Sequence, residues 1–204
     1  MARGIATRLL SGGHSVTLMD RQLDKARSTA EQIAASAKNG AKVQGAAIGS
    51  PIKDEIVILA IPYGATGEVI ENFGSQLSGK TIIDITNPLN GSYDGLAVAP
   101  GTSAAEEIAK ELPSNAKVFK AFNTTFAQTL VSGQVDGNKL DVFVAGDDEE
   151  AKAKVTQLIS DGGLRAIDAG PLSRARQLEA MGFLGITLQG TLGTSFKSAW
   201  KIVA

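Results

Sequence analysis

Two kinds of hydrophobic pattern divide this chain into strands and helices. Residues 55–62 (EIVILAIP) and 81–85 (TIIDI) are almost continuously apolar, which is typical of strands covered on both faces in a parallel sheet. Residues 2–10 and 23–38 instead carry apolar side chains three or four positions apart, which predicts amphipathic helices. Strands and helices of these kinds alternate along the chain. The pattern therefore predicts an α/β fold with a doubly wound parallel sheet.

Further elements follow from the same patterns and from the turn residues between them. The other expected strands are residues 16–19, 41–44, 117–121, 140–145 and 164–168. The other expected helices are residues 67–77, 103–112, 123–131 and 148–160, and Ser103 with Glu106 forms a capping box. A last helical region, 173–203, is expected to be broken at Gly182, Gly185, Gly190 and Gly193. We therefore divide the chain into a sheet domain, residues 1–168, and a small C-terminal helical element, residues 169–204.

The chain opens with a helix, a glycine turn and a short strand that ends in Asp20 and Arg21. This order matches the second half of a dinucleotide-binding βαβ unit. The first half of that unit, an apolar strand with a G-x-G-x-x-G/A turn, is absent. Met1 and Ala2 stand where the last x and the closing small residue of the turn would fall. We therefore expect an N-terminally truncated Rossmann domain that lacks its first strand and its glycine loop.

Small, polar or proline residues follow most of the expected strands. Ligands of open parallel sheets bind outside the carboxyl ends of the strands, so these residues are expected on one rim. Each group alone is compatible with an ordinary turn, but together they predict a groove for an extended ligand. The residues of this rim are Asp20, Arg21, Ala60, Ile61, Pro62, Tyr63, Thr86, Asn87, Pro88, Ala121, Phe122, Asn123, Thr124 and Gly146.

Asp20 and Arg21 give opposite indications about the nucleotide. An acid at this position accepts hydrogen bonds from the adenosine ribose and favours NAD, whereas an arginine pairs with a 2′-phosphate and favours NADP. Both residues are present, so both cofactors stay open. A third interpretation is that the two side chains are only solvated turn charges.

The composition excludes several classes of function. Lys and Arg number 20 against 21 Asp and Glu, and this net charge of −1 argues against a nucleic-acid or anionic-membrane partner. The chain has no cysteine and one histidine, so we expect neither thiolate chemistry nor a metal site. No apolar run reaches the roughly 18 residues that span a bilayer, and no signal-peptide pattern is present. A cytoplasmic protein with small-molecule partners is expected.

Several short segments occur in an order that resembles a known family. They are residues 57–62 (VILAIP), 83–89 (IDITNPL), 120–124 (KAFNT), 144–148 (VAGDD) and 168–172 (DAGPL). The chain resembles the NADP oxidoreductases that use the 8-hydroxy-5-deazaflavin coenzyme, and a membrane ferric reductase family carries a related domain. The likeness extends over nearly the whole chain. It implies a Rossmann domain with a small C-terminal element that closes the site and often mediates dimers, so a homodimer is expected.

The resemblance also implies roles for individual residues. Arg21 would hold the 2′-phosphate of NADP(H), and Asn87 with Asn123 would face the nicotinamide. The remaining cofactor-binding residues would be Met1, Ala2, Asp20, Ala60, Ile61, Pro62, Pro88 and Ala121. The electron acceptor, a deazaflavin or a flavin, would stack near Phe122, Asn123, Thr124, Gly170, Pro171 and Leu172.

Three hypotheses about function follow. The first is an NADP(H)-dependent oxidoreductase that transfers a hydride between nicotinamide and a deazaflavin or flavin-like acceptor. Such a transfer depends on stacking and alignment, so no catalytic acid, base or metal is expected. The alternative is a non-catalytic dinucleotide-binding module or sensor, in which the truncated site binds without turnover. The third is an inert fragment whose unpaired strand edges promote aggregation.

Overall fold

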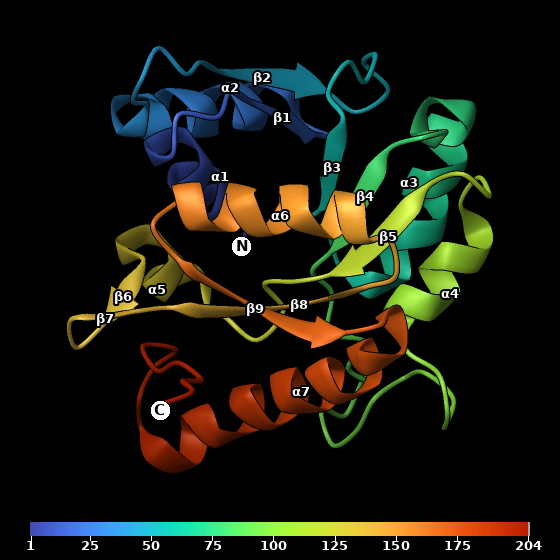
Figure 1. Cartoon of the computed structure of the whole chain (residues 1–204), viewed down its shortest axis with the longest axis vertical. Coiled ribbons are helices and arrows are strands. Elements are labelled where there is room, and N and C mark those ends of the chain that lie inside the picture. Colours follow the sequence, from blue (N-terminus) through green and yellow to red (C-terminus); the bar gives the residue numbers. More distant parts are fainter. Residues whose placement is uncertain (204) are drawn as a thin grey trace.

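The computed structural model describes residues 1–203, in which helices and strands alternate (Figure 1). The α-helices are α1 (Ala2–Ser11), α2 (Leu23–Ile33), α3 (Thr66–Phe73), α4 (Ala104–Glu111), α5 (Ala127–Ser132), α6 (Glu149–Asp161) and α7 (Ala175–Leu192). The strands are β1 (Val16–Asp20), β2 (Val43–Ala47), β3 (Ile56–Leu59), β4 (Thr81–Asp84), β5 (Lys117–Lys120), β6 (Gln134–Val135), β7 (Asn138–Lys139), β8 (Asp141–Gly146) and β9 (Arg165–Gly170). Four short 3-10 turns are η1 (Ala34–Ser36), η2 (Tyr63–Ala65), η3 (Gly74–Leu77) and η4 (Leu172–Arg174). The predicted α/β class is confirmed.

The strands form a doubly wound arrangement with one interruption. β3, β4 and β5 run parallel side by side, and β8 and β9 extend the sheet beyond β5. β1 and β2 form a separate parallel pair (Figure 1). Within residues 1–203, no strand pairs with the second edge of β1 or with the second edge of β3. This interruption is where a Rossmann sheet has its first strand.

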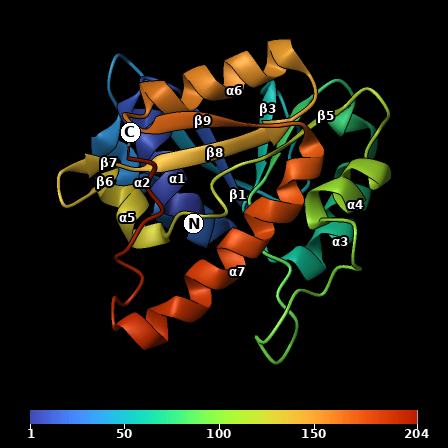
Figure 2. The same cartoon turned by 60° about the horizontal axis from the view of Figure 1, so that its bottom comes forward.

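Helices cover both faces of the strands. On one face, α1, α5 and α6 pack against β4, β5 and β8 in a large apolar cluster that includes Ile5 and Ile83. On the other face, α3 and α4 pack against β3 and β4 in a cluster that includes Val69 and Ile82. Figures 1 and 2 both show α6 and α7 on opposite sides of β8 and β9. This double cover explains the continuous apolar runs, because such strands have no face in solvent.

β8 runs antiparallel to β3, β4 and β5, which the hydrophobic pattern did not predict. It pairs antiparallel with β5, with Gly146 opposite Phe119, and β9 pairs parallel with β8. The connection from β5 to β8 consists of α5 and the small β6–β7 hairpin. This connection stays at the carboxyl end of β5, whereas a strand parallel to β5 would need a crossover back to the amino end. The expectation that Gly146 lies on the rim beside Asn123 is therefore wrong.

Two predicted helices differ in detail from the observed ones. The helix expected at residues 123–131 begins only at Ala127, because the chain first turns at Thr125. The N–H and the hydroxyl of Thr125 both donate to the carbonyl O of Phe122, at 3.0 and 2.6 Å. α7 is not broken at its glycines but continues for 18 residues to Gly193, whose positive φ of 62° ends it.

Other predictions are close to the structure. The capping box is present, since the Ser103 hydroxyl accepts the N–H of Glu106 at 3.2 Å. The strand expected at residues 41–44 is displaced to Val43–Ala47. Within residues 1–203, no helix combines the length and the apolarity that crossing a membrane requires. The division at residue 168 stays a prediction.

Candidate dinucleotide site

The rim at which β3, β4 and β5 end brings the central predicted residues together. The last residues of these strands are in register, with Leu59 beside Asp84 and Asp84 beside Lys120. Beyond the strands, Nδ2 of Asn87 donates to the carbonyl O of Asn123 at 2.8 Å, and Nδ2 of Asn123 donates to Oδ1 of Asn87 at 2.9 Å. The two asparagines therefore lie together, as the sequence led us to expect.

The apolar residues predicted for this rim differ in exposure. Ala60 and Ile61 are half-buried, and Pro62 is exposed at the start of the turn that leads into α3. Pro88 and Ala121 are buried. The three residues after β3 are therefore accessible to a ligand, whereas the other two support the backbone of the loops.

Phe122 has a backbone conformation that is rare outside glycine. Its φ is 62°, and its side chain is 1% exposed within the large apolar cluster. Left-handed non-glycine residues are strained and occur often at functional sites, where the surrounding structure holds them. Here the turn ends β5 and sets Asn123 against Asn87. The buried ring is not available for stacking on an electron acceptor, contrary to the expectation.

Three buried side-chain oxygens beside this turn have no hydrogen-bond partner. They are Oγ1 of Thr86, Oδ1 of Asn123 and Oγ1 of Thr124, and only two other buried side-chain atoms in residues 1–203 are in the same state. A buried polar atom without a partner is destabilising by about 1–3 kcal/mol. Three of them at the carboxyl ends of two adjacent strands therefore point to a ligand with hydrogen-bonding groups.

A buried ionic network lies next to the asparagines. Nζ of Lys120 is 2.6 Å from Oδ2 of Asp84 and 2.7 Å from Oε1 of Glu179, and none of the three side chains is exposed. The carboxylate of Glu179 also accepts the N–H groups of Ala104 and Ala105, at 3.0 and 3.3 Å. Burial raises the pKa of Glu179, against the opposing effects of Lys120 and of these N–H groups. The network joins β4, β5, α4 and α7 behind the rim.

α7 approaches the asparagine pair very closely. The carbonyl O of Leu178 accepts from Nδ2 of Asn123 at 2.7 Å. A Cβ atom at Gly182 would lie only 2.2 Å from Oδ1 of Asn87. Gly182 is therefore needed for the contact between this helix and the rim, and it does not act as a helix breaker.

Sequence reasoning missed Lys120, Glu179 and Gly182 as parts of this site. A lysine at the end of an apolar strand was a usable signal, because lysine is almost never fully buried unless it is paired. Nothing in the sequence marked Glu179 as its partner, since the two residues meet only through the packing of α7.

The adenosine end of the predicted groove is exposed. Oδ1 of Asp20 accepts the N–H of Gln22 at 3.0 Å, and Nζ of Lys25 lies 3.3 Å from Oδ2. The hydrogen bond from Gln22, followed by the effect of Lys25, lowers the pKa of Asp20. Arg21 is exposed and forms no ion pair within residues 1–203. Asp20 is thus engaged within its own turn, while the guanidinium of Arg21 is available to an anion.

Met1 and Ala2 lie at the start of α1. Met1 is half-buried against the large apolar cluster, and Ala2 is exposed. Burial lowers the pKa of the terminal amine of Met1. No side chain caps this helix, so its first backbone N–H groups can receive an anion.

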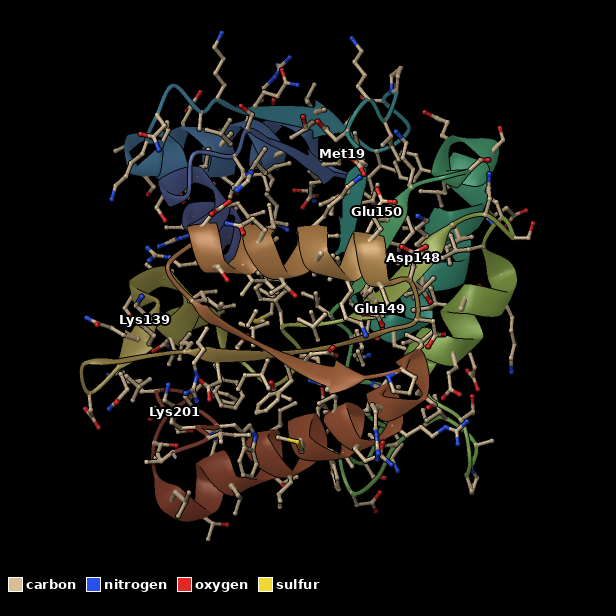
Figure 3. All side chains as sticks on the ribbon, viewed as in Figure 1. Met19, Lys139, Asp148, Glu149, Glu150 and Lys201 are labelled. Atoms are coloured by element: carbon tan, nitrogen blue, oxygen red, sulfur yellow. The ribbon has the colours of Figure 1, made fainter. Side chains whose placement is uncertain are left out.

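One predicted loop, Gly170, Pro171 and Leu172, follows the edge strand β9. This strand runs antiparallel to β5 because of the pairing of β8. The N–H of Leu172 donates to Oδ1 of Asp147 at 2.9 Å, and the next residue, Asp148, pairs with Lys117 at the start of β5 (3.0 Å). Figure 3 shows Asp148 at the beginning of α6. Gly170 pairs with Ala145, which pairs with Lys120, so the loop begins two strands away from the end of β5, and its contact with an electron acceptor stays a prediction.

An α/β sheet with helices on both faces and a polar rim at its strand ends is the architecture of dinucleotide-binding oxidoreductases. The family described as "NADP oxidoreductase coenzyme F420-dependent" matches residues 1–88. The F420-dependent NADP reductase of Methanothermobacter marburgensis is 32% identical over 195 residues, covering 91% of this chain and 86% of the relative. This chain belongs to the family of F420-dependent NADP oxidoreductases. Coenzyme F420 is the 8-hydroxy-5-deazaflavin named above.

Two further comparisons agree with this assignment. The metalloreductase STEAP3 of Rattus norvegicus is 31% identical over 180 residues, which are 88% of this chain but 34% of that protein. A crystal structure from Arthrobacter sp. FB24, assigned as an F420-dependent NADP-reductase, superposes with a TM-score of 0.81 at 30% identity and covers 99% of this chain and 94% of that one.

Proposed function

We propose that this protein binds NADP(H) along the rim and transfers a hydride between the nicotinamide and a deazaflavin, coenzyme F420. One observation carries the proposal: the buried side-chain oxygens of Thr86, Asn123 and Thr124, beyond the ends of β4 and β5, have no hydrogen-bond partner. A carboxamide offers the N–H groups that these oxygens lack. The names of the relatives support the choice of the two cofactors.

The residues of the chain bind and orient in this proposal, and none transfers a proton. The nicotinamide and the deazaflavin supply the hydride chemistry between them when both are bound. Asn87 and the carbonyl O of Leu178 fix the amide of Asn123, so that its free Oδ1 has one orientation. Such preorganisation aligns two planar reactants, which is the main requirement of a hydride transfer.

The other half of the nucleotide is assigned to the exposed end. Arg21 pairs with the 2′-phosphate, and the first N–H groups of α1, after Met1 and Ala2, receive the pyrophosphate. Ala60, Ile61 and Pro62 line the path between the two ends. Because Asp20 could bind the ribose hydroxyls of NAD, NAD is the alternative cofactor. One oxygen of the Asp20 carboxylate, however, already accepts the N–H of Gln22.

A turnover assay with paired variants tests this assignment. NADPH oxidation is measured with a panel of deazaflavin and flavin acceptors, and at least one acceptor is expected to support turnover. The variant Asn123→Asp loses the donor to Asn87 and Leu178, and kcat/KM is expected to fall about 10- to 100-fold. Asn115→Asp, at an exposed amide bonded to Ser78, is the matched control. Absence of turnover with every acceptor would contradict the proposal.

The unpaired edges of β1 and β3 favour a second candidate function. In a Rossmann domain the glycine loop that holds the pyrophosphate lies beside these two strands. In the second candidate function the pyrophosphate is therefore held less firmly, and the protein binds the nucleotide without turnover, as a non-catalytic dinucleotide-binding module or sensor. Calorimetric binding of NADPH in the absence of any reductase activity would favour this function.

We also propose a homodimer in the cytoplasm, without a nucleic-acid partner. Exposed Leu184 and Leu192 on α7 support association through that helix, and the net charge of −1 supports the exclusion of nucleic acid. Light scattering of the purified protein tests the dimer, and a monomer at all concentrations would contradict it.

A further inference from the structure

The charges of the buried ionic network do not balance. The carboxylates of Asp84 and Glu179 both contact the ammonium group of Lys120, and none of the three side chains is exposed. Within residues 1–203, no second cation pairs with either carboxylate. Two carboxylates and one ammonium group leave one negative charge in excess. Water does not screen a charge that is buried in this way, so its effect extends to neighbouring groups.

The N-terminus of α4 offsets only part of this excess. The N–H groups of Ala104 and Ala105 donate to the carboxylate of Glu179 at 3.0 and 3.3 Å. A helix N-terminus is equivalent to about half a positive charge, so about half a negative charge remains. The first turn of α4 also carries two acidic residues, Glu106 and Glu107, which add no positive charge.

The remaining charged groups around Glu179 leave the excess in place. Glu106 forms an ion pair with Arg176 of α7 at 2.6 Å, and this pair is neutral as a whole. Glu107 accepts a hydrogen bond from the hydroxyl group of Tyr63. None of these neighbours supplies a cation to the network.

The negative charge of Glu179 acts as far as the rim, where Tyr63 directly follows Pro62. Burial raises the pKa of the Tyr63 hydroxyl. The hydrogen bond with Glu107 and the negative charges of Glu107, Glu111 and Glu179 raise this pKa further. A group on the ligand side of the network therefore experiences its charge.

The network also contacts the site to which we assign the nicotinamide. Oδ1 of Asp84 accepts the N–H of Thr86 at 2.8 Å, and Thr86 carries one of the unpartnered oxygens. Glu179 directly follows Leu178, whose carbonyl O accepts from Nδ2 of Asn123. The excess charge therefore lies behind the same side chains that would hold the carboxamide.

We propose that the ionic network sets the redox preference of the site, because its excess negative charge stabilises the oxidised nicotinamide relative to the reduced one. The inference rests on the proposed function. Oxidation of NADPH transfers a hydride, a proton with two electrons, to the acceptor and leaves one positive charge on a ring that was neutral. The network thus strengthens binding of NADP⁺ relative to NADPH and favours hydride transfer to the deazaflavin.

Calorimetric titration with NADP⁺ and with NADPH tests the inference through the ratio of the NADPH Kd to the NADP⁺ Kd. Glu179→Gln keeps an acceptor for α4 but removes the excess charge, so this ratio is expected to fall about 3- to 10-fold. Asp84→Asn, on a different element, keeps an acceptor for Thr86 and should lower the ratio in the same direction. Glu71→Gln, at an exposed position of α3, is the matched control and should leave the ratio unchanged.

The pH dependence of the same ratio is a second measurement, which needs no substitution. Burial raises the pKa of Glu179, and protonation of this carboxylate removes the excess charge. The ratio is expected to fall as pH decreases through this pKa in the unaltered protein and to stay constant in Glu179→Gln. The 2′-phosphate titrates in both nucleotides, so its effect cancels in the ratio.

A purely structural role of the network would weaken the binding of both nucleotides equally. An unchanged ratio in both variants, or an equal decrease in Glu71→Gln, would therefore overturn the inference. If both nucleotides bind with an unchanged ratio, the inference alone is wrong. If neither nucleotide binds to the unaltered protein, the proposed function is wrong as well.

Discussion

The two ends of the candidate groove are held in different ways. At the nicotinamide end, Asn87 and Asn123 bond to each other, and the buried charges of Asp84, Lys120 and Glu179 lie behind them. At the adenosine end, Arg21 is exposed on a turn of a strand whose second edge is unpaired. The first end is preorganised by packing, whereas the second depends on the ligand for its order. Substitutions should therefore affect stability and turnover at the first end, and nucleotide selectivity at the second.

Lys120→Met should have the largest effect, a loss of stability. The change leaves the carboxylates of Asp84 and Glu179 buried without a cation, and breaking a buried pair in this way lowers the free energy of unfolding by about 3–5 kcal/mol. Urea denaturation measures the loss. Lys154→Met, at the exposed pair with Glu55, is the control and should change little. Equal stability of the two variants would contradict the role of the network.

Gly182→Ala should lower activity strongly. The new methyl group would lie 2.2 Å from Oδ1 of Asn87, so either α7 or Asn87 must move. We expect kcat/KM to fall about 10- to 100-fold. Gly190→Ala on the same helix has nothing within 4 Å and should preserve activity while slightly raising stability. Steady-state kinetics and thermal melting of both variants measure these effects. Similar values of kcat/KM for the two variants would show that the close contact between Gly182 and Asn87 is unimportant for activity.

Arg21→Gln should change selectivity and leave folding unaffected. Loss of the guanidinium removes the pairing with a 2′-phosphate, so affinity for NADPH should fall about tenfold while affinity for NADH stays the same. Calorimetric titration with both nucleotides measures the two affinities. Arg27→Gln, on the following helix, is the control. A parallel decrease for NADPH and NADH would mean that Arg21 does not recognise the phosphate.

The smallest effect is a dependence of stability on pH. Burial raises the pKa of Glu179 above its ordinary value of 4.5, so the folded protein binds this proton more tightly than the unfolded chain. The resulting contribution is fully present below pH 4.5 and is lost as pH rises through the folded pKa. Lys120 and two N–H groups of α4 contact the same carboxylate, and Asp84 pairs with the same lysine. Glu179→Gln should flatten the decline of melting temperature above pH 4.5, whereas Glu68→Gln on α3 should not.

The site was partly predictable because its residues follow strands with clear apolar patterns. Asn87 and Asn123 come directly after two such strands, and parallel strands place their carboxyl ends together. Residues 170–172 follow an equally clear strand, but the direction of that strand was not predictable, because apolarity does not reveal the direction in which a strand runs. The burial of Phe122 was also hidden, since its left-handed turn depends on contacts with distant residues.

The sequence by itself determined the order of helices and strands and the rim formed by β3, β4 and β5. These features follow from local periodicity and from short motifs. Only the tertiary structure decided the reversal of β8, the continuity of α7 through its glycines, and the meeting of Lys120 with Asp84 and Glu179. Each of these depends on contacts between residues far apart in the chain, and no local pattern of side chains encodes which distant surfaces will meet.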